Sequence, residues 1–225
     1  LLTFFFFFFG AAVGKYGRLG RQGDMKRAAY LSGVPSGALQ LVVVGKDPYP
    51  RSAVEIPFCK ESLSELYVHN CSGGVVLNSL GYSKASAQKL YGGDSLSLFL
   101  ALRESGVVFL NAIYRDTKDA ETSRDIGKKI LKARDIDALK RAYEQNEDVL
   151  VRAKNVILCG EAKKLVRWLP GVPLSAEGGH VHCVVHPDVR NKWRDEWIAW
   201  WAPDAVRIRF GLNFSDIAGE DQLLR

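Results

Sequence analysis

The chain contains 225 residues, of which 47% are hydrophobic and 25% are charged, a composition typical of a folded globular protein. It carries 31 lysines and arginines against 25 aspartates and glutamates, which gives a net charge of +6. These values exclude an intrinsically disordered chain and a strongly acidic binding protein, and the positive excess mildly favours polyanionic partners. No segment approaches the roughly 18 consecutive apolar residues that cross a bilayer, so we expect no membrane span.

The first part of the chain does not show the pattern of a packed domain. Leu1–Val13 includes a run of consecutive phenylalanines but lacks the basic start of a signal peptide, so a trimmed targeting segment, a cloning artefact and a buried strand all remain open. The residues that follow, up to Arg27, are rich in basic side chains and glycine, as in a mobile basic arm. We therefore expect an N-terminal segment, residues 1–38, that is partly flexible or cannot be assigned, and a single domain over residues 39–225.

From Leu39 onward, short apolar runs alternate with amphipathic segments. The apolar runs predict buried strands over Leu41–Gly45, Val107–Leu110, Val156–Cys159 and His180–Val185. Helical patterns cover Leu96–Arg103, Asp135–Arg152 and Glu161–Leu169, and tryptophans at 193, 197, 200 and 201 follow the spacing of one buried helix face. Strands that alternate with helices predict an α/β fold, with a central parallel four-stranded sheet and helices on both faces.

Cysteine usage argues against a metal centre. The chain has four cysteines, without a C-x-x-C pair, as is typical of reduced thiols in an intracellular protein rather than of a disulfide scaffold, a zinc site or an iron–sulfur cluster. His180, His182, Cys183 and His186 look like a metal cluster, but strand alternation places His182 and Cys183 on opposite faces. We expect neither a metal nor a cofactor.

Polar residues follow every predicted strand, where ligands bind in parallel sheets. The four segments are Gly45-Lys46-Asp47-Pro48-Tyr49-Pro50, then Asn111, then Gly160-Glu161, and finally His186-Pro187-Asp188-Val189-Arg190. Each has a structural explanation when it is taken alone, because an aspartate at a strand end can cap a helix, an asparagine can form a turn and a histidine can lie in the core.

Taken together, these segments resemble the uracil-DNA glycosylases whose signatures are GQDPY, LLLN and HPS. The chain carries the corresponding motifs in the same order, as Gly45–Tyr49, Phe109–Asn111 and His186–Asp188. Phe58 stands where the family has its uracil-stacking phenylalanine. The resemblance covers about Leu39 to Phe214, and its details are most similar to the poxvirus-type branch. It implies a uracil-DNA glycosylase-like fold for the single domain.

The chemistry of such an enzyme asks for these residue types. Cleavage of the bond between deoxyribose and uracil places positive charge on the sugar and negative charge on the departing base. Asp47 can orient the attacking water and stabilise the sugar cation, while His186 can donate a hydrogen bond to the uracil anion. As the resemblance implies, a neutral imidazole suffices for that role. We therefore expect Asp47 and His186 to be the catalytic residues of a monofunctional hydrolase.

Uracil specificity is expected from a second group of residues. Asn111 can pair its amide with the N3 and O4 edge of uracil, where cytosine presents the opposite pattern of donors and acceptors. By resemblance, Tyr49 packs against C5 and excludes the methyl group of thymine, Phe58 stacks on the flipped base, and Lys46 acts largely through its backbone. The alternative is that Tyr49 and Phe58 are ordinary aromatic residues of the hydrophobic core, with no role in binding.

DNA contacts are expected from the loops around the pocket. In one loop, the hydroxyl of Ser62 is the candidate hydrogen-bond donor to a DNA phosphate. Its alternative role is that of a helix cap before Leu63. Gly160 matches the Gly-Ser loop of the family, but Glu161 replaces the serine and would repel phosphate. Arg190 is the first candidate to fill the space left by the flipped nucleotide, and Val189 is the second. Asp188, in place of the family's serine, would weaken binding.

We therefore expect a uracil-DNA glycosylase that acts on uracil in single- or double-stranded DNA during base excision repair. Such a protein works inside the cell, in the nucleus, the cytoplasm or an organelle that contains DNA. A protein inhibitor of these enzymes or a replication protein is a further partner to consider. The alternative is a glycosylase-like DNA-binding or polymerase-processivity subunit in which catalysis is weak or lost, an interpretation that the altered phosphate loops favour.

Overall fold

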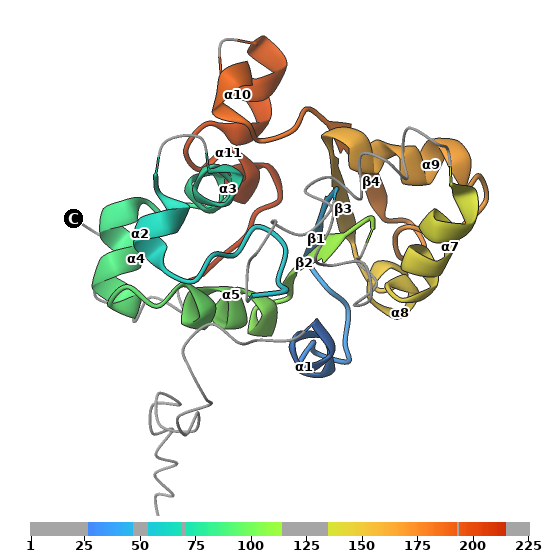
Figure 1. The fold of residues 1–225 in the computed structure, drawn as a ribbon, viewed down its shortest axis with the longest axis horizontal. Helices are drawn as coiled ribbons and strands as arrows, with labels where there is room; N and C mark the ends of the chain where they lie inside the picture. Colours follow the sequence, from blue (N-terminus) through green and yellow to red (C-terminus); the bar gives the residue numbers. More distant parts are fainter. Residues whose placement is uncertain (1–26, 47–53, 69–70, 114–134, 193, 215–225) are drawn as a thin grey trace, which may run out of the picture.

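A single parallel sheet forms the centre of the protein. The structure, a computed structural model, describes residues 27–46, 54–68, 71–113, 135–192 and 194–214. Its strands are β1 (Leu41–Gly45), β2 (Val107–Asn111), β3 (Asn155–Cys159) and β4 (His180–Val184), and they pair in parallel in the order β2-β1-β3-β4 (Figure 1). The predicted α/β fold with a four-stranded parallel sheet is thus confirmed, and each strand lies within about a residue of the predicted range.

The strands β1, β2 and β3 are largely apolar because both faces of the sheet are covered. Every residue of β1, β2 and β3 is buried, whereas most of β4, at one edge of the sheet, is exposed or only partly buried. Continuous apolar runs such as Leu41–Val44 are the sequence pattern that burial on both faces requires. The register pairs Gly45 with Asn111, so the ends of β1 and β2 lie side by side.

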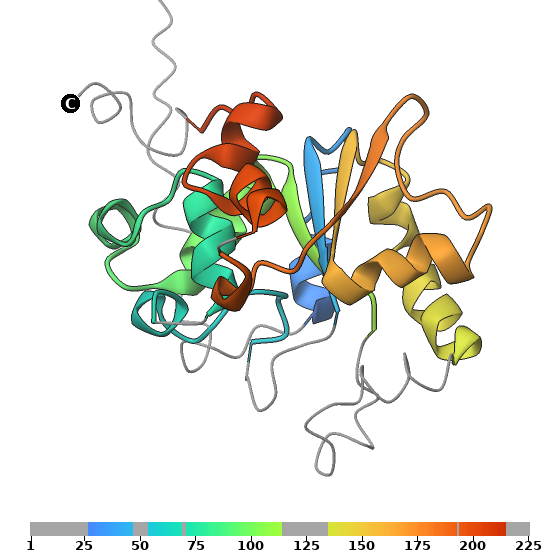
Figure 2. The same ribbon diagram turned by 90° about the horizontal axis from the view of Figure 1, so that it is seen from above.

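Helices cover both faces of the sheet. Figures 1 and 2 show one group of helices on one side of the sheet and a second group on the opposite side. The first group consists of α2 (Leu63–Leu66), α3 (Ser72–Ser79), α4 (Lys84–Tyr91), α5 (Ser95–Glu104), α10 (Asp195–Trp201) and α11 (Ala205–Arg209). The second consists of α7 (Ile136–Glu144), α8 (Glu147–Leu150) and α9 (Lys164–Trp168), the last preceded by the 3-10 turn η2 (Gly160–Lys163).

Two of the three predicted helices are found close to their expected places. The segment Leu96–Arg103 lies within α5, whose N-terminus is capped by Asp94, because this side chain accepts a hydrogen bond from the Ser97 amide at 3.2 Å. The segment Glu161–Leu169 forms η2 and α9, and the helix ends before Pro170 as expected.

The third prediction, one long helix over Asp135–Arg152, is wrong. The chain forms α7 and α8 with a break at Gln145 and Asn146. The physical reason is the side chain of Asn146, which is 2% exposed and donates a hydrogen bond to the Asn111 carbonyl at 3.0 Å. The buried hydrogen bond of this amide favours a break in the helix more strongly than the regular charge pattern favours its continuation.

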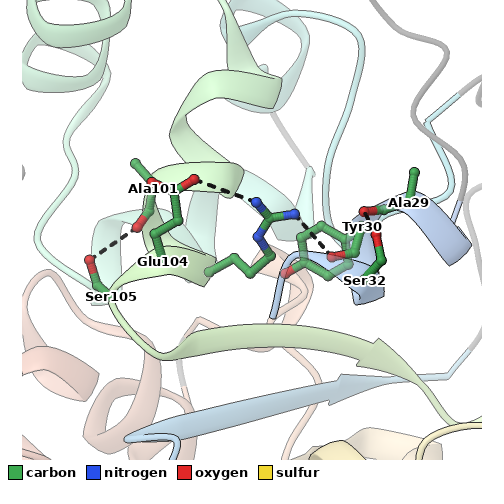
Figure 3. A network of polar contacts seen from close by, with 7 residues as sticks. Ala29, Tyr30, Ser32, Ala101, Glu104 and Ser105 are labelled. Carbon is green, nitrogen blue, oxygen red and sulfur yellow. Dashed lines mark hydrogen bonds and ion pairs between the residues drawn. The ribbon is translucent and has the colours of Figure 1, made fainter. Parts of the chain in front are cut away.

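The helix α1 (Arg27–Ser32) covers the outer edge of β2. Tyr30 is 1% exposed, and its hydroxyl accepts a hydrogen bond from the Phe109 amide at 3.1 Å. Arg103 of α5 donates to the Tyr30 carbonyl at 3.0 Å, and the dashed lines in Figure 3 mark the polar contacts around Tyr30 and Glu104. The packed part of the chain therefore reaches back at least to Arg27, before the boundary expected at Leu39. The phenylalanine run and the rest of residues 1–26 lie outside the described residues.

The tryptophan-rich segment forms α10. Trp201 is 1% exposed, and its indole nitrogen donates to the Val185 carbonyl at 2.8 Å, while Trp197 and Trp200 are half-buried against the core. The expected buried helix face is therefore present, with Trp193 outside the described residues. None of the helices in the described ranges has the length and apolar character that a bilayer crossing needs.

Candidate functional site

The predicted site residues gather at the carboxyl edge of the sheet. Gly45 and Asn111 end β1 and β2, Gly160 follows β3, and His186 follows β4. The strand that follows β1 in the chain, β2, pairs with one edge of β1, and β3 pairs with the other edge. In parallel sheets, ligands bind at the carboxyl ends of the strands where the strand order reverses in this way. Two backbone hydrogen bonds hold the edge together, from Ala112 to the Gly45 carbonyl at 2.8 Å and from Ile113 to the Lys46 carbonyl at 3.0 Å.

Gly45 is the point at which Asn111 and Phe58 meet. A Cβ atom added to Gly45 would lie 3.1 Å from the amide oxygen of Asn111 and 3.1 Å from Cζ of Phe58. Asn111 is 1% exposed and Phe58 is 7% exposed. The absence of a side chain at Gly45 therefore allows an amide oxygen and an aromatic ring from distant parts of the chain to approach the same backbone position.

Phe58 holds an unusual backbone conformation. Its φ is +64°, a value that costs a residue with a side chain about 1–3 kcal/mol and that is often found at functional sites. Close packing around it stabilises this conformation, because a Cβ on Gly73 would lie 2.1 Å from the Phe58 carbonyl oxygen and the Phe58 ring meets Phe109 edge-on at 6.3 Å. The neighbouring helix α3 thus needs a glycine at position 73 so that Phe58 can face Gly45.

His186 lies in a partly buried position next to Gly160. Burial lowers the pKa of the His186 imidazole below its ordinary value of 6.5; Asp188 opposes this shift, and the positive charges of Lys46 and Arg190 reinforce it. Gly160 has a φ of +55°, and a Cβ there would lie 3.0 Å from Cβ of His186. The lowered pKa favours the neutral form of the imidazole.

Asp188 and Arg190 form a close ion pair. The Arg190 Nε lies 3.0 Å from one carboxylate oxygen of Asp188 and 2.9 Å from the other, and the Arg190 amide also donates to Asp188 at 2.9 Å. These hydrogen bonds lower the pKa of the Asp188 carboxyl. The Arg190 side chain is 81% exposed. The short turn η3 (Val189–Asn191) contains Val189, whose side chain lies outside the described part of the structure.

The other two expected DNA-binding positions have local partners. Ser62 caps α2, because its hydroxyl oxygen accepts a hydrogen bond from the Glu65 amide at 3.3 Å. Glu161, which follows Gly160, forms an ion pair with Lys164. The charge of Glu161 is thereby partly balanced, and the observed contacts of Ser62 are those of a helix cap.

Two expected residues cannot be placed and one unexpected residue joins the site. Asp47 and Tyr49 lie outside the described residues. Asn146 was not expected, yet it supports Asn111 from the side of β2 away from β1. It stands in the polar run Glu144–Asp148, where the sequence carries no sign that an asparagine is buried.

His182 packs among aromatic side chains and not towards the site. Its ring lies 5.3 Å from that of Trp200 and 5.4 Å from that of Phe210, while Cys183, the next residue, is exposed. Within the described ranges, no group of three or more histidine, cysteine or acidic side chains could hold a metal ion.

The sequence was compared with protein-family models and with curated proteins. No protein-family model matches the sequence, and the search of curated proteins finds no match. A buried amide and a ring beside Gly45, with a neutral imidazole at the same edge, can bind a flat heterocycle through its hydrogen-bonding edge and its face.

Proposed function

We propose that the protein is a uracil-DNA glycosylase, which flips uracil out of DNA and hydrolyses its N-glycosidic bond to leave an abasic site. The observation that carries this proposal is the meeting of Asn111 and Phe58 over Gly45, at the sheet edge where His186 also lies. The motifs that resemble those of the uracil-DNA glycosylases occur in these same segments. No metal or cofactor takes part in the proposed reaction.

The amide of Asn111 would read the flipped base. Because this side chain is almost fully buried, a base that presents the wrong donors and acceptors leaves polar groups unpaired, which costs about 1–3 kcal/mol for each group. Uracil matches an amide that donates to O4 and accepts from N3, whereas cytosine reverses this pattern. Phe58 would offer a ring for stacking, Lys46 its backbone, and Tyr49 a side chain against C5.

His186 would stabilise the departing uracil anion, since a neutral imidazole keeps one N–H group that can donate a hydrogen bond to the developing negative charge. The burial that lowers its pKa supports this role. Asp47 would orient the attacking water and stabilise the positive charge on the sugar. These two roles together account for both charges that develop as the bond breaks.

DNA would be held along the rim of this edge. The exposed guanidinium of Arg190 is the proposed group that enters the space left by the flipped nucleotide, with Val189 as the second candidate. Ser62 and Gly160 are the residues proposed to contact the phosphate backbone of the DNA. We propose that the protein acts on single- or double-stranded DNA inside the cell, in base excision repair, with a protein inhibitor or a replication protein as further partners.

The test is release of a base from a single-stranded oligonucleotide that contains one uracil, beside oligonucleotides with thymine or cytosine at that position. The wild-type chain is compared with Asp47→Asn and His186→Leu, and with His182→Leu as the matched control, because His182 packs on Trp200 and Phe210 away from the site. We expect release of uracil alone, a loss of at least about 100-fold in the two site variants, and little change in the control.

One result would overturn the proposal. A folded wild-type chain that binds DNA and releases no uracil would favour the alternative, a DNA-binding or polymerase-processivity subunit. This alternative is favoured by Glu161 and Asp188, two acidic residues that stand where the resembled family has serines. Both carboxylates are paired with basic side chains.

A further inference from the structure

We propose that Arg27 and Asn146 are positioning residues for base recognition. From the outer side of β2, they fix the positions of the segments that carry Asn111 and Phe58. This inference rests on the proposed function, because it concerns the same site. It concerns residues that lie far from the expected motifs, one in α1 and one between α7 and α8.

The first link joins Asn146 to Asn111. The Nδ2 atom of Asn146 donates to the backbone carbonyl of Asn111 at 3.0 Å, and the exposed fractions of the two residues are 2% and 1%. Among the described residues, β2 lies at the edge of the sheet, so its outer carbonyl groups face no other strand of that part of the chain. The amide of Asn146 takes the place of such a strand at Asn111, the residue of β2 whose side chain lies against Gly45.

The second link joins Asn146 to Arg27. The Nη2 atom of Arg27 donates to Oδ1 of Asn146 at 3.2 Å and to the Gln145 carbonyl at 2.7 Å. An amide can be rotated so that its oxygen and nitrogen exchange places. Here a rotated Asn146 would turn its oxygen towards the Asn111 carbonyl and its nitrogen towards the guanidinium, so Arg27 fixes the orientation in which Asn146 can bond Asn111.

The third link joins Arg27 to the segment that carries Phe58. The backbone amide of Arg27 donates to Oε2 of Glu55 at 3.0 Å, and Glu55 precedes the buried run Ile56–Cys59. Arg27 therefore contacts both segments that meet over Gly45, through its side chain on one and its main chain on the other. A displacement of about 1 Å between reacting groups can reduce the rate about 100-fold, so bonds of this kind can affect catalysis without touching DNA.

The test compares Asn146→Asp, Arg27→Ala and Arg27→Lys with wild type, in steady-state release of uracil from the single-stranded oligonucleotide. Asn146→Asp keeps the shape of the side chain but places a carboxylate oxygen against the Asn111 carbonyl. We expect kcat to fall about 10- to 100-fold for Asn146→Asp and about 3- to 10-fold for Arg27→Ala, with KM changed less than about threefold. Arg27→Lys keeps a donor and should recover part of the loss.

Arg152→Ala is the matched control. Arg152 also reaches across the chain to backbone carbonyls, those of Pro35 and Gly37, but the segment that it anchors is the one after α1. Its kcat should stay within about twofold of wild type. In the double variant Arg27→Ala with Asn146→Asp, the loss should be no larger than for Asn146→Asp alone, because the side chain of Arg27 affects Asn111 through the Asn146 amide.

The proposal is overturned if Asn146→Asp is folded, with circular dichroism like wild type, and keeps its kcat, or if Arg152→Ala loses as much activity as Arg27→Ala. Hydrogen exchange keeps the test independent of the proposed function. If wild type releases no uracil, the proposed function fails, but faster exchange at the amides of Ala112 and Ile113 in Asn146→Asp, with no such change in Arg152→Ala, would still support the positioning role. Unchanged exchange there would overturn it.

Discussion

Gly160 lies directly against His186. A Cβ atom on Gly160 would come within 3.0 Å of the Cβ and within 3.4 Å of the Cδ2 of His186, and the φ of Gly160 is +55°. The glycine therefore serves two needs at the end of β3, a left-handed turn of the backbone and an unobstructed place for the imidazole. This relationship can be tested by a single added methyl group.

We expect Gly160→Ala to lower uracil release about 10- to 100-fold, because the methyl group displaces His186. The left-handed φ adds about 1 kcal/mol of instability to this variant. Gly178→Ala separates the two effects, since Gly178 also has a left-handed φ, +73°, but nothing lies within 4 Å of its Cβ position. Equal losses of activity in both variants, measured beside thermal unfolding, would contradict the role of Gly160.

A second methyl test applies to Gly45. Gly45→Ala pushes against the Asn111 amide oxygen and the Phe58 ring, so we expect a loss of about 1–3 kcal/mol in the free energy of unfolding and a large loss of base release. Gly37→Ala is the control, because nothing lies within 4 Å of that Cβ position. Urea unfolding measures the first effect. Stability like wild type in Gly45→Ala would mean that Phe58 and Asn111 can move apart freely.

The neutral state of His186 makes a prediction about pH. The pKa of His186 is lower in the folded protein than its ordinary value of 6.5, because of burial. Between these two pKa values the unfolded chain binds more protons, so the stability from this group is full above 6.5 and falls as the pH drops towards the folded pKa, by at most about 1.4 kcal/mol for each pH unit. Urea unfolding between pH 7.5 and about 5 should show a shallower loss for His186→Gln. Parallel pH curves for the two proteins would show that burial does not hold the imidazole neutral.

Asn111→Asp tests base discrimination. A carboxylate can accept from the amino group of cytosine but repels the O4 atom of uracil, so we expect uracil release to fall about 100-fold or more and cytosine release to become measurable. Asn155→Asp is the control, because Asn155 is also a buried asparagine, at the opposite end of the sheet, where its Nδ2 bonds the Gln40 carbonyl at 3.2 Å. Undiminished uracil release by a folded Asn111→Asp would remove Asn111 from the recognition of the base.

The pair of Asp188 and Arg190 predicts an effect on DNA binding. Asp188→Asn removes a negative charge beside the proposed DNA path and releases Arg190 from its carboxylate partner, so affinity for a uracil-free oligonucleotide should rise about 3- to 10-fold at low salt. Asp204→Asn is the control, because Asp204 pairs with Arg207 in the same way, at 2.6 Å. Fluorescence anisotropy at 50 and 200 mM salt would measure both. An equal gain in the two variants would indicate a general effect of net charge.

The strands and the strand-end residues could be predicted because their sequence signals are local. An apolar run such as Val107–Leu110 is buried on both faces wherever it occurs in a parallel sheet, and polar residues after it must lie at the carboxyl edge. The fold alone therefore brings Asn111 beside Gly45. No knowledge of the loops is needed for that step.

The supporting residues could not be predicted, because their roles depend on contacts across the chain. Asn146 breaks a regular charge pattern only because the Asn111 carbonyl lies within its reach, and Arg27 looks like part of a basic arm until its partners are known. The helix α3 carries Gly73 and Gly74, which reduce its helical signal, yet Gly73 makes room for the Phe58 carbonyl. The role of each of these residues depends on a contact with a residue that is distant in the sequence.

The contacts on the outer edge of β2 also have a consequence for association between chains. Tyr30 and Asn146 bond the outward-facing amide of Phe109 and carbonyl of Asn111, which would otherwise be open to another strand. A chain that begins at Leu39 would lose Tyr30 and leave the Phe109 amide without its hydroxyl partner. Such a fragment could keep most of its core and still aggregate, because the same backbone groups would pair with a second molecule.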